Sequence, residues 1–361
     1  MRVYYDFQIL AWQKYGGISR YFFELYSRME ALGAEPHVQC FGSVNYYFRD
    51  HVAMTSPEKY NPAVRFLRRK LYGALNRIRA LYSMRKCDIL HPTFYSPYMI
   101  GRYSCKLIVT VHDMIYEKFS DGLHGSATIR NKKIMLHSAD HIIAVSQNTK
   151  KDVLELYPDI EPEKISVIYH GNSMPELDSR GANPLGKRYV LFVGSRGWYK
   201  NFARFAEAMC PILEARPDLY VLCAGGGSFK PSDLEAMGSL SNRYIQRGLD
   251  DETLRQAYAN AECFVFPSEY EGFGIPVLEA FACSCPLVCS NSSSLPEVAG
   301  DAAEYFDPLD VEDMSAKILK VLEDDRLREK LRALGRERLK LFDWDKTARK
   351  TFECYSRVLE G

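Results

Sequence analysis

The chain has 361 residues, of which 47% are hydrophobic, and its formal net charge at pH 7 is +1. This length suits two domains better than one core, and the composition is that of an ordinary globular protein. No apolar run approaches membrane-spanning length, and the near-neutral charge argues against nucleic-acid binding. Because the N-terminus shows no charged leader before an apolar segment, we expect the protein in the cytoplasm.

The ten cysteines are scattered and lack the Cys-x-x-Cys pairs of a structural zinc site. We therefore expect reduced thiols, most of them in the core. The sequence Asp343-Trp344-Asp345 precedes a helical pattern, which favours capping of that helix over a metal site.

Short apolar runs alternate with helical patterns through the first half of the chain. A helical pattern follows Tyr15-Gly16-Gly17 and ends at Gly33. The strand candidates are Val3 to Leu10, Pro36 to Phe41, Cys87 to His91, Lys106 to Val111, His141 to Val145 and Ile165 to Tyr169. Strands that alternate with helices predict crossover connections and a parallel sheet covered on both faces.

The stretch from Arg65 to Lys86 carries eight basic side chains and no acidic one. Apolar side chains recur along one face of the predicted helix: Leu67, Leu71, Leu75, Ile78 and Tyr82. Such a helix can cover a core and face water, or it can contact an anionic membrane or a lipid-linked acceptor. Both interpretations stay open, and the second implies a peripheral protein at the inner face of the membrane.

Between Gly171 and Lys187 the pattern gives way to Asn, Ser, Pro, Gly and Arg, which predicts a domain linker. Alternation then resumes, with strand candidates at Tyr189 to Val193, Leu219 to Ala224, Tyr244 to Gln246, Cys263 to Phe266 and Pro286 to Ser290. The sequence therefore predicts an α/β protein with two doubly wound, Rossmann-like domains, residues 1–175 and 185–343.

The most informative stretch is Phe264 to Pro286, FVFPSEYEGFGIPVLEAFACSCP. An apolar run ends at Pro267, a glycine-containing loop follows, and Pro276 stands where a helix can begin. We expect a strand, a loop that holds Glu271, and a helix that holds Glu279 in its first turns. The N-terminus of such a helix attracts phosphate and sugar hydroxyl groups.

Ligands of open parallel sheets bind beyond the carboxyl ends of the strands. Polar and glycine residues follow the strand candidates in both halves: Gly16-Gly17, His112-Asp113, Ser146 and His170-Gly171, then Gly194-Ser195-Arg196, Lys200, Gly225 to Gly227 and Glu269 to Gly274. This concentration predicts a cleft between two domains whose carboxyl edges face one another. Basic side chains and glycine loops suit a diphosphate, and the glutamates suit hydroxyl groups, so the pattern is typical of a nucleotide-sugar site.

Glu271 and Glu279 match the E-x7-E motif of retaining GT-B glycosyltransferases, a large family of bacterial polysaccharide and lipopolysaccharide transferases. The chain resembles that family in YGGISRYF, VTVHD, FVGSRGWYKN, RGLDDETLRQAYANA, PSEYEGFGIPVLEAFAC and LPEVAGDAAEYFDP. The resemblance spans nearly the whole chain. It implies the GT-B fold, in which the C-terminal helix, residues 344–361, crosses back to the first domain.

The resemblance also implies that the first domain receives the acceptor and the second binds the nucleotide sugar. The donor-binding residues that it implies are Gly16, Gly17, Arg196, Lys200, Gly225, Arg247, Leu249, Glu271, Phe273, Gly274, Ile275 and Glu279. The catalytic residues that it implies are His112, Glu271, Lys200 and Arg196. Many members carry arginine directly after the glycine of the first loop in this domain. Here Ser195 intervenes, which leaves the partner of Arg196 open.

By the same resemblance, Arg196 and Lys200 would bind the diphosphate, and Glu279 would bind the ribose. Glu271, with the backbone amides at 273 and 274, would hold the donor sugar, and His112 would approach the transferred sugar. Gly17 would lie near the β-phosphate. The segments 225–227 and 247–249 would border the base.

The implied reaction is retaining transfer of a hexose from a nucleotide sugar to a saccharide or lipid-linked saccharide, in surface polysaccharide synthesis. No metal or other cofactor is expected. Members that carry a YGGISRYF-type segment often use GDP-mannose, which makes it the first donor to test, ahead of UDP- and dTDP-sugars. In this family the leaving phosphate is thought to help deprotonate the acceptor, so Glu271 is not assigned as a nucleophile.

Two rival functions deserve comparison. A dinucleotide-dependent oxidoreductase also has two α/β domains, but it needs G-x-G-x-x-G after its first strand, and Tyr15-Gly16-Gly17-Ile18-Ser19 does not supply it. A non-catalytic nucleotide-sugar-binding module would show the same motifs and would bind the donor without turnover. The sequence leaves that alternative open.

Overall fold

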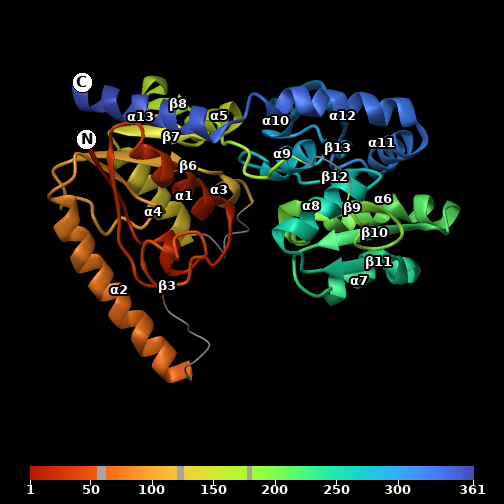
Figure 1. Cartoon of the computed structure of the whole chain (residues 1–361), viewed down its shortest axis with the longest axis horizontal. Helices are drawn as coiled ribbons and strands as arrows, with labels where there is room; N and C mark the ends of the chain where they lie inside the picture. The colour runs from red at the N-terminus through yellow and green to blue at the C-terminus, as the bar shows by residue number, and fades with distance from the viewer. Residues whose placement is uncertain (55–61, 120–125, 177–180) are drawn as a thin grey trace. The chain divides into compact units, whose positions relative to one another are not determined.

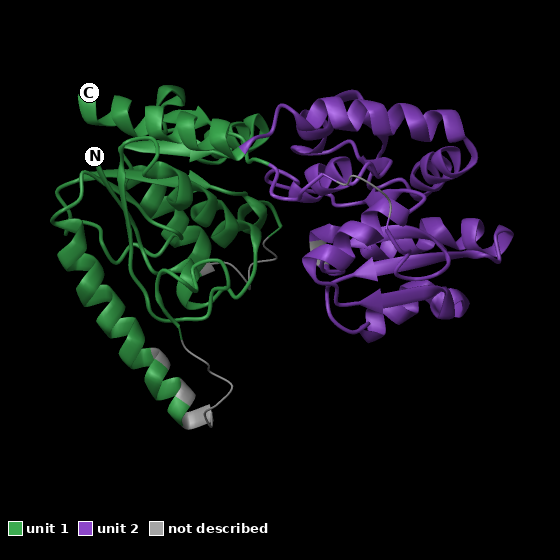
Figure 2. Ribbon diagram, viewed as in Figure 1, with its two compact units in different colours: residues 1–171, 344–361 green, residues 172–343 purple. Residues whose placement is uncertain are grey.

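The computed structural model describes residues 1–54, 62–119, 126–176 and 181–361 (Figure 1). The chain divides into two compact units, shown in green and purple in Figure 2. Unit 1 contains Met1–Gly171 and Trp344–Gly361, and unit 2 contains Asn172–Asp343.

Unit 1 is built on a six-stranded parallel sheet with the strand order β2-β1-β5-β6-β7-β8. Its strands are β1 (Arg2–Tyr5), β2 (Glu35–Val38), β5 (Ile89–His91), β6 (Lys106–Val111), β7 (His141–Ala144) and β8 (Ile165–Val167). Strand β1 pairs with β2 on one side and with β5 on the other, so the order of the strands reverses at β1. The reversal is a topological switch point, where open α/β sheets bind ligands.

The helices of unit 1 are α1 (Gly17–Met29), α2 (Pro62–Met84), α3 (Ile115–Lys118), α4 (Ser126–Ser138), α5 (Gln147–Leu156) and α13 (Trp344–Glu360). Short 3-10 helices lie at Ile9–Ala11 and Pro162–Lys164, and β3 (Phe41–Ser43) pairs with β4 (Ala53–Met54). Strands β5 and β7 are buried along their whole length, as is β6 after its first residue. Burial on both faces explains why these strands read as apolar runs.

The C-terminal helix α13 packs on α1 and belongs to unit 1. The hydroxyl of Tyr355 lies 2.5 Å from Nδ1 of His91 and 3.3 Å from the hydroxyl of Tyr5. Thr347 Oγ1 donates a hydrogen bond of 2.7 Å to the carbonyl oxygen of Tyr169. Buried polar contacts therefore tie the end of the chain to strands β1 and β5 and to the residues after β8.

Helix α2 contains most of the basic stretch, and the burial of its side chains shows which face packs on unit 1. Its buried side chains are Asn76, Ala80 and Met84. The face that the sequence marks as apolar is exposed, with Leu67 at 69% and Ile78 at 68%. That face does not cover a core, because the helix packs on unit 1 through the side that carries Asn76, Ala80 and Met84. Among the described helices, α2 included, none is long and apolar enough to cross a membrane.

Unit 2 also contains a six-stranded parallel sheet, with the order β11-β10-β9-β12-β13-β14. Its strands are β9 (Arg188–Val193), β10 (Leu219–Ala224), β11 (Tyr244–Arg247), β12 (Phe264–Phe266), β13 (Leu287–Ser290) and β14 (Ala303–Phe306). Strand β9 pairs with β10 on one side and β12 on the other, which places the switch point between β9 and β12.

The helices of unit 2 are α6 (Phe202–Ala215), α7 (Pro231–Met237), α8 (Asp251–Asn260), α9 (Ile275–Ala282), α10 (Leu295–Ala299), α11 (Val311–Glu323) and α12 (Asp325–Leu339), with 3-10 helices at Trp198–Lys200, Gly238–Arg243 and Gly300–Ala302. Aspartates cap three of them: Asp250, Asp310 and Asp324 accept backbone hydrogen bonds at the starts of α8, α11 and α12. The predicted class, α/β with two Rossmann-like halves, is confirmed.

Candidate active site

The switch point of unit 2 brings two predicted residues together. Lys200 follows β9 and Glu271 follows β12, and Lys200 Nζ lies 2.6 Å from Glu271 Oε1. The two side chains are only 16% and 12% exposed. A mostly buried cation and carboxylate stabilise each other, and removal of either leaves an uncompensated charge.

Serine hydroxyl groups hold the loop that carries Glu271. The backbone N–H of Glu271 donates to Ser293 Oγ at 2.9 Å. Ser294 Oγ donates to the carbonyl oxygens of Glu271 and Phe273, at 2.9 and 3.0 Å. Ser292 Oγ donates to the carbonyl oxygen of Glu269 at 3.0 Å. The serine-rich segment after β13 therefore fixes the backbone of the loop.

The loop turns into α9 at Gly274, whose φ is +99°. Only glycine adopts this conformation readily. A Cβ atom there would lie 2.8 Å from Leu295 Cδ2, so a side chain would also displace the core. No side chain of a described residue caps α9 at Gly274. The positive end of the helix dipole therefore lies beside Glu271 and Lys200.

Glu279 lies one turn into α9. Its Oε2 accepts a hydrogen bond of 3.0 Å from the hydroxyl of Tyr258, which is fully buried on α8. Burial, with the charge of Glu279 in second place, raises the pKa of Tyr258 well above its ordinary value. Tyr258 thus remains a hydrogen-bond donor and orients the carboxylate of Glu279.

Arg196 is buried and surrounded by protein acceptors. Its Nε lies 3.0 Å from Asp233 Oδ2. Its terminal nitrogens donate to four carbonyl oxygens in the turn after β10, those of Gly225, Gly226, Gly227 and Ser228. The three glycines have φ values of +82°, +71° and +69°. This left-handed run lets several carbonyl groups converge on one guanidinium group.

Two further predicted residues lie next to that turn. The carbonyl oxygen of Arg247, at the end of β11, accepts a hydrogen bond of 2.9 Å from the Gly225 N–H. The Arg247 side chain is exposed, and Leu249 is half-buried two residues further on. The structure therefore brings Gly225 and Arg247 together at the carboxyl edge of the sheet.

In unit 1, His112 follows β6 and belongs to an aromatic cluster. Its ring stacks on His170, with centroids 5.8 Å apart and planes 8° from parallel, and meets Tyr21 edge-on at 5.1 Å. Burial lowers the pKa of His112 well below its ordinary value, and the nearby His170 and His91 add to the shift. Burial also lowers the pKa of His170 to about 3.

The Nε2 atom of His112 is buried and has no hydrogen-bond partner among the described residues. A buried polar atom without a partner is uncommon in native proteins and requires an explanation. A neutral imidazole whose Nε2 has no partner among the described residues can form a hydrogen bond with a hydroxyl group of a ligand at the carboxyl edge of the sheet. The neighbouring His91 differs, since Tyr355 and Thr110 engage both of its ring nitrogens.

Gly16 and Gly17 lie at the start of α1. Gly17 is the first residue of the helix, and the Gly16 carbonyl oxygen accepts hydrogen bonds from the Arg20 N–H and the Ser19 hydroxyl, at 3.0 and 3.1 Å. Gln13 Oε1 accepts a hydrogen bond of 3.0 Å from the Ser19 N–H. The glutamine caps the helix, and the glycines leave the backbone at its start without side chains.

Two family models match the chain: "Glycosyltransferase Family 4" over residues 15–172 and "Glycosyl transferases group 1" over residues 173–338. O-antigen chain mannosyltransferase B of Escherichia coli is 29% identical over 371 residues, which cover 94% of this chain and 95% of that protein. The chain is a GT-B glycosyltransferase.

Solved structures show the same fold as this glycosyltransferase. Sucrose-phosphate synthase from Thermosynechococcus elongatus matches with a TM-score of 0.78 at 19% identity, over 99% of both chains. Anabaena HepE, crystallised with UDP and glucose, matches with a TM-score of 0.72 at 16% identity, over 98% of this chain and 99% of its own.

Several residues that surround the candidate site were missed by the sequence analysis. The serines after β13 form a visible run in the sequence, but hydroxyl groups in a loop carry no sign of what they bind. Tyr258 lies within RGLDDETLRQAYANA, one of the segments that carry the family resemblance, but that resemblance gave it no role. Asp233 is the third residue of α7, where an acidic side chain is already explained by the N-terminus of the helix.

Proposed function

We propose that this glycosyltransferase moves a hexose from a nucleotide sugar to a saccharide or lipid-linked saccharide acceptor, with retention of anomeric configuration. The observation that carries the proposal is the Lys200–Glu271 pair beside the N-terminus of α9. Negative charge develops on the diphosphate as it departs. A fixed cation and a helix N-terminus stabilise that charge where it forms.

Lys200 is the cation for the diphosphate, and Glu271 accepts hydrogen bonds from hydroxyl groups of the donor sugar. Arg196 acts indirectly, because Asp233 and the glycine carbonyl groups already surround its guanidinium group. It is a positioning residue that holds the turn at Gly225. Contact of Arg196 with a phosphate group would require exchange of those partners.

The remaining residues complete the donor site in this proposal. Glu279, oriented by Tyr258, accepts hydrogen bonds from the ribose. His112 binds a hydroxyl group of the transferred sugar through its open nitrogen. The other residues that we propose to contact the base, the phosphates or the sugar of the donor are Gly16, Gly17, Gly225, Arg247, Leu249, Phe273, Gly274 and Ile275.

In this proposal unit 2 binds the donor and unit 1 binds the acceptor, and exclusion of water from the reacting centre limits hydrolysis of the donor. The leaving phosphate takes the proton of the attacking hydroxyl group on the same face of the sugar. No metal or cofactor takes part. The first donor to test is GDP-mannose, supported by the similarity to an O-antigen chain mannosyltransferase, and surface polysaccharide synthesis is the matching role.

Helix α2 supports a further element of the proposal, peripheral contact with the inner face of the membrane. Its exposed apolar side chains include Leu67, Leu71 and Ile78, and exposed basic side chains such as Lys70 and Arg79 lie on the same helix. Exposed apolar groups beside basic groups favour the interface of an anionic bilayer.

A thermal-shift panel of GDP-mannose, UDP-glucose and a dTDP-sugar tests the donor. A ligand at a hundred times its Kd stabilises the folded protein by about 2.7 kcal/mol. We expect GDP-mannose to give the largest shift, and Glu279→Ala to reduce it. An α-linked product, identified by NMR, demonstrates retention. Donor binding with neither transfer nor hydrolysis supports the non-catalytic binding module and refutes the enzymatic proposal.

A further inference from the structure

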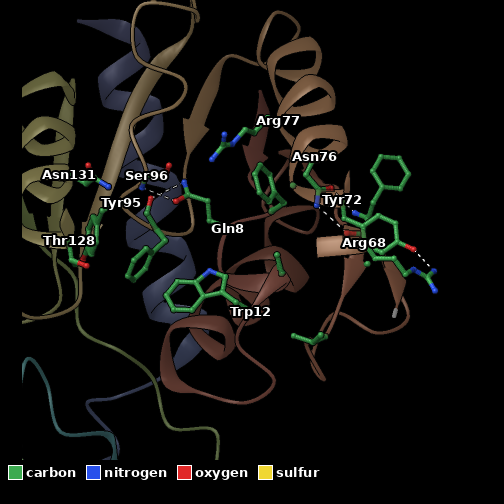
Figure 3. A pocket seen from close by; sticks show the side chains of 17 residues that line it. Gln8, Trp12, Arg68, Tyr72, Asn76, Arg77, Tyr95, Ser96, Thr128 and Asn131 are labelled. Atoms are coloured by element: carbon green, nitrogen blue, oxygen red, sulfur yellow. Dashed lines mark hydrogen bonds between the residues drawn. The ribbon is translucent and has the colours of Figure 1, made fainter. Parts of the chain in front are cut away.

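A groove of about 830 Å³ lies in unit 1, apart from the residues assigned to the donor. Its walls come from segments that follow β1 and β5, from β3, from the inner side of α2 and from the start of α4 (Figure 3). The order of the strands reverses between β1 and β5. The groove therefore occupies the switch point of unit 1, where this type of sheet binds ligands.

Aromatic side chains form much of the lining: Phe7, Trp12, Phe41, Tyr72, Phe94 and Tyr95. The indole of Trp12 is 53% exposed and packs edge-on against Phe94, with centroids 4.8 Å apart. In Figure 3, Trp12, Tyr95 and Gln8 form one side of the groove, and Tyr72 and Asn76 form the other. Exposed aromatic rings that are held rigidly suit the flat C–H faces of pyranose rings.

Two amide side chains of the lining are fixed by the protein itself. Gln8 donates to Asp6 Oδ2 at 2.6 Å and accepts from the Ser96 N–H at 2.8 Å. Asn76 forms hydrogen bonds with both backbone groups of Phe41, at 2.7 and 3.1 Å. These contacts hold the side chains of Gln8 and Asn76 in place before a ligand binds.

Other polar groups of the lining are available to a ligand. Thr128 and Asn131 on α4 form no side-chain hydrogen bond with any residue that the structure describes. The same is true of Arg77 on α2, whose guanidinium group points toward the groove in Figure 3. A hydroxyl, an amide and a guanidinium group thus face the space beside the aromatic rings.

The lining is positively charged. Its charged residues are Arg68 and Arg77, and no aspartate or glutamate is among the residues that form it. Arg68 donates to the Tyr72 hydroxyl at 2.6 Å, whereas Arg77 has no carboxylate partner in the described part of the chain. Guanidinium groups bind phosphate and carboxylate groups with paired hydrogen bonds.

Tyr95 connects the groove to the turn that carries His112. It lines the groove, and its hydroxyl accepts a hydrogen bond of 3.3 Å from the backbone N–H of His112. Lys132, next to Asn131 on α4, donates to the carbonyl oxygen of Asp113 at 2.9 Å. A ligand in the groove therefore lies beside the turn that carries the proposed reacting centre.

We propose that this groove binds the acceptor and selects saccharides that carry an anionic group, which Arg77 recognises. The inference rests on the proposed function, since it assumes that unit 1 receives the acceptor. The aromatic rings hold a pyranose, and the guanidinium group pairs with a phosphate ester or a uronic acid carboxylate attached to the sugar. Both sources present the same chemistry to Arg77.

The test is a titration of the purified full chain, followed by tryptophan fluorescence. The probes are glucose 1-phosphate, glucuronic acid, methyl α-glucoside and inorganic phosphate. We expect at least one anionic sugar to bind about tenfold more tightly than methyl α-glucoside and than phosphate, as one charge-assisted hydrogen bond gives. The anionic sugar that binds more tightly shows which group, a phosphate ester or a carboxylate, Arg77 recognises. Trp12→Phe should remove the signal.

Arg77→Gln should abolish the tenfold preference and leave the affinity for methyl α-glucoside unchanged. Arg79→Gln is the matched control, since Arg79 is exposed on the same helix but is not part of the lining, and it should retain the preference. Equal binding of methyl α-glucoside and both anionic sugars overturns the inference, as does phosphate alone binding as tightly as the sugars.

Donor binding separates this inference from the proposed function. Arg77→Gln should show the same thermal shift with GDP-mannose as the parent protein, because Arg77 lies outside the residues assigned to the donor. An unchanged shift together with no anion preference overturns the acceptor inference alone. Failure of the parent protein to bind any nucleotide sugar overturns the proposed function.

Discussion

Replacement of Lys200 by methionine tests the site most directly, because it removes a charge and keeps most of the side-chain volume. Two effects are expected from one substitution. The Glu271 carboxylate loses its partner, which lowers the free energy of unfolding. The departing diphosphate loses its cation, which lowers the rate of transfer.

The structure sets the size of each effect. Lys200 Nζ and Glu271 Oε1 are 2.6 Å apart, with side chains 16% and 12% exposed. Loss of one member of a buried pair costs about 3–5 kcal/mol, and partial exposure lowers this to about 2 kcal/mol. Loss of one group that stabilises a developing charge lowers kcat by about 10²–10³.

A double variant separates the two effects. Lys200→Met combined with Glu271→Gln leaves no unpaired charge, so the free energy of unfolding should return to within about 1 kcal/mol of the parent value. Turnover should not return, because the cation is still absent. Urea unfolding measures the first quantity, and release of GDP from GDP-mannose in the presence of acceptor measures the second.

The matched control is Arg204→Met. Arg204 pairs with Glu269 at 2.7 Å, but its side chain is 42% exposed, so its loss should cost less than about 1 kcal/mol and leave turnover unchanged. Normal turnover by a folded Lys200→Met variant would refute the assignment. So would a double variant that regains activity together with stability.

Three further predictions follow from the geometry. Gly274→Ala should lower the free energy of unfolding by about 1–3 kcal/mol, because φ at Gly274 is +99° and the new Cβ would meet Leu295. Gly197→Ala is the control: it has open space at Cβ and should be close to neutral. Urea unfolding measures both. Acidification should destabilise the fold, because the pKa of His170 is about 3 when folded and about 6.5 when unfolded, so the unfolded state takes up a proton as the pH falls below about 6.5. His170 alone should lower the free energy of unfolding by about 1.4 kcal/mol per pH unit down to about pH 3, and His91, His112 and His141, whose pKa values are also lowered, should add to this slope. His170→Phe should make the dependence of the free energy of unfolding on pH shallower. An unchanged dependence would show that the pKa of His170 is not lowered in the folded protein. Leu71→Glu on α2 should abolish cosedimentation with anionic liposomes, and Leu341→Glu, equally exposed in unit 2, should not; equal loss or equal retention would rule out docking through α2.

Strands buried on both faces were the easiest elements to predict. The predicted ranges for β6 and β10 agree with the structure at both ends. Strand β10 is an apolar run between Asp218 and Gly225, and between Lys106 and His112 the apolar run of β6 is interrupted only by Thr110. Strand β14 was missed. It lies at the edge of its sheet, is mostly half-buried and carries the charged Glu304, so it contains no run of apolar residues.

The place of Lys200 and Glu271 could be predicted, because each follows a strand next to the switch point and the carboxyl ends of parallel strands share one edge. The hydrogen-bond partners of Arg196 could not be predicted from the sequence. Its partners depend on three consecutive left-handed glycines, and the sequence shows the glycines without the direction of their carbonyl groups. The sequence left open whether the apolar face of α2 is buried or exposed, for a related reason. A period of 3.6 residues shows that a helix has an apolar face, but not which side the rest of the unit covers.

The two units place their polar groups at equivalent points of one topology. In each sheet the first strand of the unit has the second strand on one side and a later strand on the other. Lys200 and Glu271 follow the strands at this reversal in unit 2, and Gln8 and Ser96 follow the strands at the reversal in unit 1. A transferase needs two binding sites of different chemistry. The unit 2 site pairs a lysine with a carboxylate that can accept from sugar hydroxyl groups, and the unit 1 groove has aromatic rings, two arginines and no acid. If the two proposed sites hold, repetition of one fold with different residues at the switch point is sufficient to supply a donor site and an acceptor site in a single chain.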